Sequence, residues 1–323
     1  TVTLILIGLT PKLMNHTILN AQQYNITPYN TIYMYIIESP PVTSFSAYNP
    51  NIFHGGIATY GMYYDFLASL NITSNTMVPD LADWWNITVL PNGTLEVLLN
   101  LRHTGWSDGT PVTCNDVYAT NLFLGLFEVM FKVDDMAGNV TIINSTTCAF
   151  LVPQGFYLPL TSPGNIIDDL FGTLDWGGVA VVWAYHIWKP LVDAATANYS
   201  YIYLYNFGPP SVAASAEHNI SSLISELFTY KPSSAAGDGP FYLCDITPEY
   251  FLLCKNPYFY AANKIPVQYI VLWQYSSMAQ VYAALASGKI SYWQTGGTSV
   301  SPTLLSQILS NPYIKMHVYP AFG

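Results

Sequence analysis

Residues 98–117 read LLNLRHTGWSDGTPVTCNDV, and this stretch decides the fold. Apolar residues occupy every second position over 95–101, which is the period of a strand with one buried face. Asp108-Gly109 predicts a tight turn, because glycine takes a positive φ without steric cost. Thr113 and Asp116 have the spacing of a helix N-cap pair, in which the hydroxyl binds a free backbone amide and the carboxylate lies at the positive end of the helix. The stretch therefore predicts a strand, a turn and the start of a helix.

The composition limits the classes of function. Only 9% of the 323 residues are charged, whereas about 25% is usual for soluble domains. The formal net charge is −10. An acidic chain lacks the basic face that binding to nucleic acid requires, so we expect no nucleic acid partner. The length is sufficient for about two domains with their own cores.

Glycosylation sequons of the form Asn-x-Ser or Asn-x-Thr are frequent. Their number favours a secreted glycoprotein, and together with the low charge it indicates the outside of an archaeal cell. The sequence leaves open which of them carry glycans. The sequons begin at Asn15, Asn25, Asn71, Asn86, Asn92, Asn139, Asn144, Asn198 and Asn219.

The four cysteines have no C-x-x-C spacing, so zinc and thioredoxin-like chemistry are not expected. Cys244 and Cys254 flank a predicted hairpin whose three-residue loop is 248–250, which places the two thiols opposite each other. This arrangement allows a cross-strand disulfide, and Cys114 and Cys148 would then be the remaining pair. The alternative is four buried thiols.

Known catalytic motifs are missing from the sequence. It contains no G-x-S-x-G, H-E-x-x-H, P-loop or G-x-G-x-x-G pattern. The six histidines are scattered without the spacing of metal ligands. We therefore expect that the protein is not an enzyme and that it uses no metal and no cofactor.

Membrane attachment is not visible in the sequence. The apolar run Thr1–Leu9 ends before Pro11 and is too short for a transmembrane helix. No charged segment followed by a cleavage site is present, so we expect any signal peptide to have been removed. Membrane association would then depend on an unseen anchor.

The stretch at 98–117 resembles the signature of the family 5 extracellular solute-binding proteins, the oligopeptide, dipeptide, nickel and oligosaccharide receptors of ABC importers. Other short motifs in the chain are similar to motifs of the family and occur in the same order and at similar spacing. The resemblance therefore covers about residues 30–320. One of them, Met62–Leu67, also predicts a short helix. The remaining motifs are Asn49-Pro50, Val78–Trp85, Gly237–Tyr242, Lys255–Tyr260 and Ser287–Ser291.

The resemblance implies an α/β (mixed α+β) fold of the periplasmic-binding-protein-like type II, with two lobes and an inserted β-rich lobe. Lobe I would consist of 26–56 and 161–270, and lobe II of 57–160. Residues 1–25 would be an N-terminal extension, and 271–323 would only begin lobe III. Because members of the family are longer, we expect the C-terminal remainder of the protein, or a second chain, to complete lobe III.

The function implied by the resemblance is capture of an oligopeptide or an oligosaccharide in a cleft between lobes, with delivery to an ABC transporter permease. For Trp273, packing at the hinge is the alternative to ligand contact. The chain has few charged residues to bind peptide termini, and it has many aromatic rings that could stack on sugars. Both ligand classes therefore stay open. The matching ligand-binding positions are Tyr48, Asn49, Asn51, Phe53, His54, Asp238, Trp273 and Tyr275.

A second hypothesis is a structural or adhesive glycoprotein that keeps this fold but assembles into surface filaments. The low charge, the many sequons and the extension over 1–25 are compatible with it. Both hypotheses place the protein outside the cell, at the cell surface.

Overall fold

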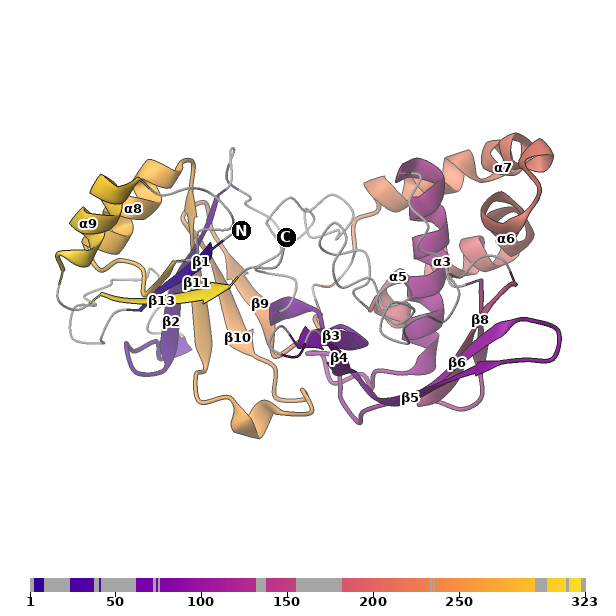
Figure 1. Ribbon diagram of the computed structural model, residues 1–323, viewed down its shortest axis with the longest axis horizontal. Helices are drawn as coiled ribbons and strands as arrows, with labels where there is room; N and C mark the ends of the chain where they lie inside the picture. The colour runs from indigo at the N-terminus through magenta and orange to yellow at the C-terminus, as the bar shows by residue number, and fades with distance from the viewer. Residues whose placement is uncertain are drawn as a thin grey trace. The chain divides into compact units, whose positions relative to one another are not determined.

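The computed structural model describes most of the chain, and its contacts divide the chain into two compact units (Figure 1). Unit 1 consists of Thr1–Ser44, Leu243–Lys255 and Asn263–Gly323, and unit 2 of Phe45–Tyr242 and Asn256–Ala262. The described residues are 3–8, 24–37, 41, 62–71, 74, 76–131, 138–154, 182–232, 234, 236–293, 301–311 and 314–320.

The units are divided at other positions than the predicted lobes. Residues 161–242, assigned to lobe I, lie in unit 2 together with 57–160. Residues 271–323, assigned to lobe III, lie in unit 1 together with the first 44 residues. The lobe boundaries therefore stay predictions.

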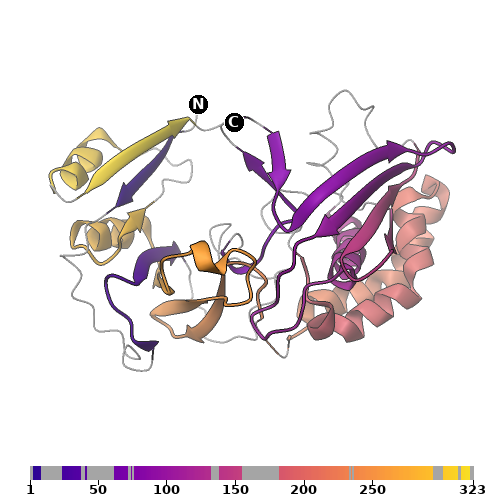
Figure 2. The same ribbon diagram turned by 90° about the horizontal axis from the view of Figure 1, so that it is seen from below.

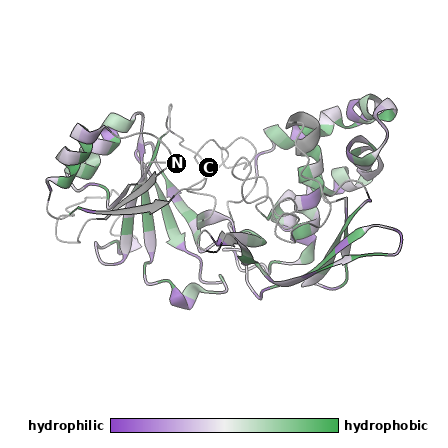
Figure 3. Ribbon diagram, in the orientation of Figure 1, coloured by the Kyte–Doolittle hydropathy of each residue, from purple (hydrophilic) through white to green (hydrophobic). Residues whose placement is uncertain are grey.

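Unit 1 is built on a four-stranded sheet with the order β2-β11-β10-β9. β2 (Thr31–Ile37) runs parallel to β11 (Tyr269–Tyr275), and β10 (Tyr250–Lys255) pairs with β11 in the antiparallel direction. β9 (Phe241–Ile246) is the far edge. All residues of β10 except the last are buried, which is typical of a central strand covered on both faces, and Figure 3 shows its hydrophobic character.

Two helices, α8 (Met278–Ala286) and α9 (Pro302–Leu309), complete the core of unit 1 (Figure 1). Side chains of α8, such as Val281 and Leu285, share one buried cluster with Leu252 and Val271 of the sheet. A short 3-10 helix, η3 (Ala262–Lys264), lies at the border between the units in the sequence.

A second sheet of unit 1 has three antiparallel strands in the order β12-β1-β13. Its outer strands are β12 (Tyr292–Trp293) and β13 (Lys315–Pro320). The central strand is β1 (Thr3–Gly8), so residues of the predicted N-terminal extension take part in a sheet.

Unit 2 contains a four-stranded antiparallel sheet with the order β5-β6-β8-β7 and a two-stranded sheet, β3-β4. The predicted strand over 95–101 is confirmed as β6, because its alternate side chains, from Leu95 to Leu101, are at most 1% exposed. The strands are β3 (Ala68–Asn71), β4 (Thr76–Pro79), β5 (Ala82–Val89), β6 (Leu95–Leu101), β7 (Asn139–Ile142) and β8 (Thr147–Val152).

Four of the described helices pack on one side of this sheet (Figures 1 and 2). They are α3 (Cys114–Phe131), α5 (Tyr185–Ala197), α6 (Tyr199–Phe207) and α7 (Pro210–Thr229). Trp183 and Trp188 meet the ring of Phe123 edge to face, with ring centroids 4.9 Å and 5.8 Å apart. Both tryptophans are buried and form part of this core.

The turn and cap predicted within 98–117 are confirmed. Gly109 has a φ of +89°, and the Thr110 amide donates to Asp108 Oδ1 at 2.9 Å. The Thr113 amide donates to Asp116 Oδ2 at 2.7 Å, while Thr113 Oγ1 accepts the Asn115 amide at 3.3 Å. α3 therefore begins with a reciprocal cap.

Two local predictions were wrong. The helix predicted over 62–67 is helical only at 62 and 63 in the described part, because the next backbone groups bind distant partners. The Asp65 amide donates to Asp238 Oδ1, and the Tyr63 carbonyl accepts the Gly239 amide. The hairpin loop is 247–249 instead of 248–250, since Tyr250 already pairs with β11.

Both cysteine pairs are joined. The Cα atoms are 6.0 Å apart in Cys114–Cys148 and 5.8 Å apart in Cys244–Cys254, within the usual range for disulfides. Among the described residues, no helix has the length and apolarity that crossing a membrane requires.

Candidate functional site

The predicted ligand residues fall into three groups. The first group, from Tyr48 to His54, lies outside the described residues. The second is Asp238, which belongs to unit 2, and the third is Trp273 with Tyr275, which belong to unit 1. The described candidates are therefore divided between the two units.

In unit 1, the last residues of β11 form a cluster with a lysine that follows α8. Lys289 Nζ lies 4.0 Å from the ring centroid of Trp273 and 5.7 Å from that of Tyr275. These three residues are called the Lys289 cluster. Distances below about 6 Å are those of cation–π attraction. In the described part of the structure, no carboxylate forms an ion pair with Lys289, so the aromatic rings carry its electrostatic contacts.

Burial changes the acidity of the polar groups in the Lys289 cluster. It lowers the pKa of Lys289, because a charged amine loses hydration, and it raises the pKa of Tyr275 to about 12. The Tyr275 hydroxyl is buried and has no hydrogen-bond partner among the described residues. A bound group with an acceptor atom would give this hydroxyl the partner that it lacks.

Trp273 itself is mainly a core residue. Its exposed fraction is 7%, and its ring meets Tyr250 edge to face at 5.6 Å. Lys289 lies over the ring, so this face of Trp273 is not open for stacking on a sugar. This environment resembles hinge packing more than a ligand platform, and within the cluster Lys289 is partly exposed whereas the Tyr275 hydroxyl is buried.

The position of the Lys289 cluster in the sheet is informative. β2 and β11 are parallel, and their last residues, Ile37 and Tyr275, are partners. In open α/β sheets, ligands bind outside the carboxyl ends of parallel strands. Residues 48–54 come after β2 in the sequence and lie outside the described residues, so the position of β11 alone supports a site at this end of the sheet.

In unit 2, Asp238 lies in a buried turn, Gly237–Gly239, called the Asp238 turn. Asp238 is fully buried, so it presents no exposed atom to a solute in this structure. Its Oδ1 accepts the Asp65 amide at 3.1 Å, whereas Oδ2 of Asp238 and Oδ2 of Asp65 have no hydrogen-bond partner among the described residues. Burial, followed by the neighbouring carboxylates, raises the pKa of Asp65 well above its usual value, and burial also raises that of Asp238.

Residues of the signature stretch bind the Asp238 turn. This long-range contact was not predicted from the sequence. The Ser107 amide donates to the Gly237 carbonyl at 2.9 Å, and Ser107 Oγ accepts the Gly237 amide at 3.3 Å. Asn256 Nδ2 donates to the carbonyls of Gly105 and Gly239, both at 3.1 Å, and lies 3.4 Å from that of Gly237. A Cβ on Gly237 would approach the Tyr63 carbonyl oxygen to 2.3 Å, so only glycine fits.

Asn256→Ala should lower the free energy of unfolding by about 2–3 kcal/mol, because it leaves buried carbonyls without donors. Chemical denaturation of the full chain measures this loss. Asn263→Ala, at an exposed position, is the matched control and should change stability by less than about 0.5 kcal/mol. Equal losses in the two variants would contradict the role assigned to Asn256.

In the part of the chain that the structure describes, no group of three His, Cys, Asp or Glu side chains is arranged to hold a metal ion. The Asp80 carboxylate is held by Tyr260, whose hydroxyl donates to its Oδ1 at 2.6 Å, and by the Ser69 hydroxyl. These contacts are those of a partly buried structural network.

Comparison with protein families gives one match. The family model of bacterial extracellular solute-binding proteins, family 5 (Middle), matches residues 76–322. No curated protein sequence matches the chain.

Solved structures share the fold. An oligopeptide-binding protein from Thermus thermophilus, complexed with a pentapeptide, has a TM-score of 0.58 at 16% identity, covering 86% of this chain and 47% of its own. A periplasmic oligopeptide-binding protein from Thermotoga maritima, bound to mannohexaose, has a TM-score of 0.53 at 17% identity, with 82% and 41% covered. NikA from Brucella suis, in complex with Fe(III)-EDTA, has a TM-score of 0.51 at 14% identity, and the match covers 80% of this chain and 42% of NikA. The chain thus spans less than half the length of these proteins.

Proposed function

The chain belongs to the family 5 extracellular solute-binding proteins, and on this premise we propose that it captures an oligopeptide or an oligosaccharide for an ABC importer. The family is made up of non-catalytic proteins that bind solutes outside the cell or in the periplasm. The match of the family model over residues 76–322 carries the proposal. We place the receptor at the cell surface, where its partner is a transporter permease.

The Lys289 cluster supports a binding site at the carboxyl end of β11. A lysine held against two aromatic rings, with no carboxylate partner among the described residues, can bind a carboxylate or another anionic group of a solute. The Tyr275 hydroxyl is buried in this structure, so it would donate a second hydrogen bond only to a ligand group that reaches below the surface. Because Lys289 covers the face of Trp273, this chemistry favours a peptide carboxylate over a stacked sugar ring.

Isothermal titration calorimetry of the full chain with pools of peptides, and separately with cello- and malto-oligosaccharides, tests the function. We expect saturable binding of one class, with peptides ahead. Lys289→Met should weaken peptide binding about tenfold or more, because a charge-assisted hydrogen bond is lost. The exposed Lys264→Met, also in unit 1, is the matched control and should bind as the wild type does.

The outcomes separate the function from the site. Saturable binding that Lys289→Met leaves unchanged would overturn the role of the Lys289 cluster but not the receptor function. No binding of either class, together with ordered polymers in negative-stain images, would instead favour the structural or adhesive surface protein.

A further inference from the structure

Three sequons of unit 2 lie on exposed parts of one sheet. Asn86 is in the middle of β5, Asn92 is in the turn between β5 and β6, and Asn144 is in the turn between β7 and β8. All three asparagines are exposed. In the register of the sheet, Asn86 is opposite Leu98, whose neighbours Val97 and Leu99 point to the buried face. Asn86 is therefore on the outer face, away from the core.

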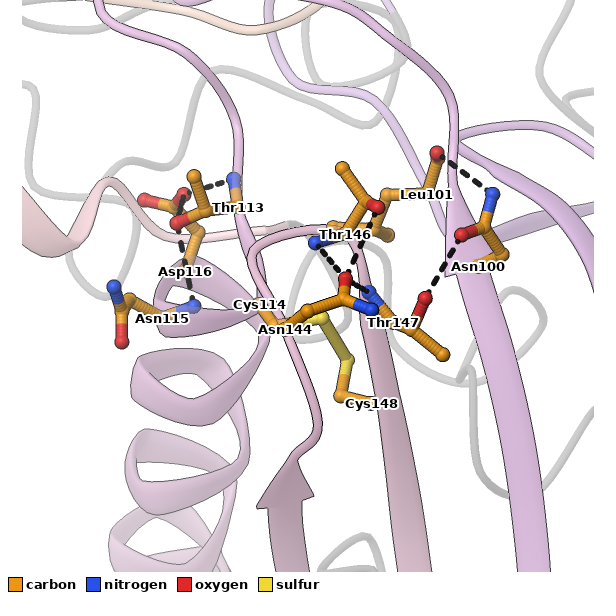
Figure 4. The surroundings of a disulfide bond; sticks show 10 residues. All are labelled: Asn100, Leu101, Thr113, Cys114, Asn115, Asp116, Asn144, Thr146, Thr147 and Cys148. Atoms are coloured by element: carbon orange, nitrogen blue, oxygen red, sulfur yellow. Dashed lines mark hydrogen bonds between the residues drawn. A yellow bond between two sulfur atoms is a disulfide. The ribbon is translucent and has the colours of Figure 1, made fainter.

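The two turn sequons have the same local geometry. Asn144 Oδ1 accepts the Thr146 amide at 2.9 Å and lies 3.3 Å from the Thr146 hydroxyl (Figure 4). Thr146 is the last residue of the same sequon. Asn92 Oδ1 accepts the Thr94 amide at 3.0 Å. Each asparagine side chain thus forms an Asx turn with the threonine that ends its own sequon. In the described structure, Nδ2 of Asn92 and Nδ2 of Asn144 make no hydrogen bond, so the atom to which a sugar is attached is available.

Asn86 has a different contact with the same consequence. Its Nδ2 donates to Thr88 Oγ1 at 3.2 Å, so its hydrogen-bond partner is the hydroxyl of its own sequon. Both residues are exposed, and β5 is the edge strand of the sheet. A modifying enzyme can therefore approach Asn86 without displacing another part of the chain.

Two other sequons have their amide nitrogen occupied by a helix. Asn198 Nδ2 donates to the Ala194 carbonyl at 2.9 Å at the end of α5, and Asn219 Nδ2 donates to the Ser215 carbonyl at 2.7 Å inside α7. A glycan on either nitrogen would require this hydrogen bond to break and the helix to open locally. Exposure alone does not separate the groups, since Asn219 is also exposed.

We propose that Asn86, Asn92 and Asn144 carry N-linked oligosaccharides and that Asn198 and Asn219 do not. The donor is an oligosaccharide linked to a lipid through phosphate. In the transfer, a bond forms between Nδ2 and the anomeric carbon of the first sugar, and the bond from that carbon to the phosphate oxygen breaks. Nδ2 loses one proton, the lipid phosphate leaves with the electron pair, and no oxidant or reductant is needed.

Glycans at these positions would protect an exposed strand edge. Among the described strands, β5 pairs only with β6, and it exposes 44% of Trp84 and 47% of Val89. Exposed edges of this kind pair readily with other chains, and bulky hydrophilic groups beside them oppose such pairing. Glycans at Asn86 and Asn92 would lie beside this edge, whereas the glycan at Asn144 would lie at the turn between β7 and β8, next to the opposite edge strand.

Glycopeptide mapping by mass spectrometry tests the proposal on the full chain, secreted from a host with an N-glycosylation pathway. The chain carries an added flexible Asn-Ala-Thr tag, whose modification shows that the host enzyme acts on this protein. We expect the occupancy of Asn86, Asn92 and Asn144 to exceed that of Asn198 and Asn219 by about fivefold or more. Tagged protein that is modified equally at both groups, or not at all at the first three sites, would overturn the proposal.

Matched variants give a second readout. Thr88→Ala and Thr146→Ala each remove one sequon while the asparagine remains, and each should lower the intact mass by one glycan. Ser200→Ala and Ser221→Ala remove the sequons of Asn198 and Asn219 and should leave the glycan mass unchanged. Loss of a glycan in either serine variant would contradict the assignment.

Discussion

Replacing Cys114 and Cys148 together by alanine should lower the free energy of unfolding by about 4 kcal/mol, the loop-closure value for their sequence separation of 34. The disulfide joins the first residue of α3 to β8 (Figure 4), so it links the helix to the sheet that it covers. Both cysteines are fully buried, so alanine also removes packed sulfur atoms. Urea denaturation of the full chain measures the change.

The second disulfide provides the matched comparison. Cys244 and Cys254 are separated by 10 residues, so their joint replacement should cost about 3 kcal/mol, less than the first pair. A reductant should shift the wild-type transition in the same direction as the double replacements. Identical transitions of the wild type with and without reductant would contradict both disulfides.

Short-range features of the fold could be predicted from the sequence. Alternation identified β6, and Asp108-Gly109 identified a turn in which glycine takes the left-handed conformation. Thr113 and Asp116 identified the start of α3. In each case the interacting groups are at most a few residues apart, so the pattern itself contains both partners.

Long-range features could not be predicted in this way. The helix expected at 62–67 is replaced by contacts of Tyr63 and Asp65 with the Asp238 turn, more than 170 residues away. Ser107 of the signature stretch and Asn256 both hold the Asp238 turn in place, although Ser107 is 130 residues from that turn in the sequence. No local pattern indicates these pairings.

The candidate site was found only in part. The resemblance to the family implied Trp273 and Tyr275 as ligand positions, but Lys289 was not among the predicted ligand residues. The signal that could have identified it is the scarcity of cations, since Lys and Arg together number nine in the chain. Any lysine is conspicuous in such a sequence.

The wild-type protein should lose stability as the pH rises from about 4 toward neutrality, because Asp65 and Asp238 are buried with raised pKa values. Above the ordinary pKa of aspartate, the folded state binds more protons than the unfolded state, so the slope of stability against pH is negative. Asp116 adds to this effect, since burial raises its pKa to about 6. The contribution is fully present below about pH 4 and is lost as the folded carboxyls ionise. Thermal unfolding midpoints measured across this pH range test the expectation.

Asp238→Asn should flatten this profile and raise the unfolding midpoint near pH 7. The amide keeps an oxygen that can accept the Asp65 amide, but it cannot ionise. The unpartnered Oδ2 of Asp238, which would carry buried charge, is removed at the same time. Asp193→Asn changes the net charge equally at an exposed position, so it should keep the wild-type slope and thereby account for general charge repulsion. If Asp238→Asn and Asp193→Asn gave the same slope, the buried carboxyls would not be the cause.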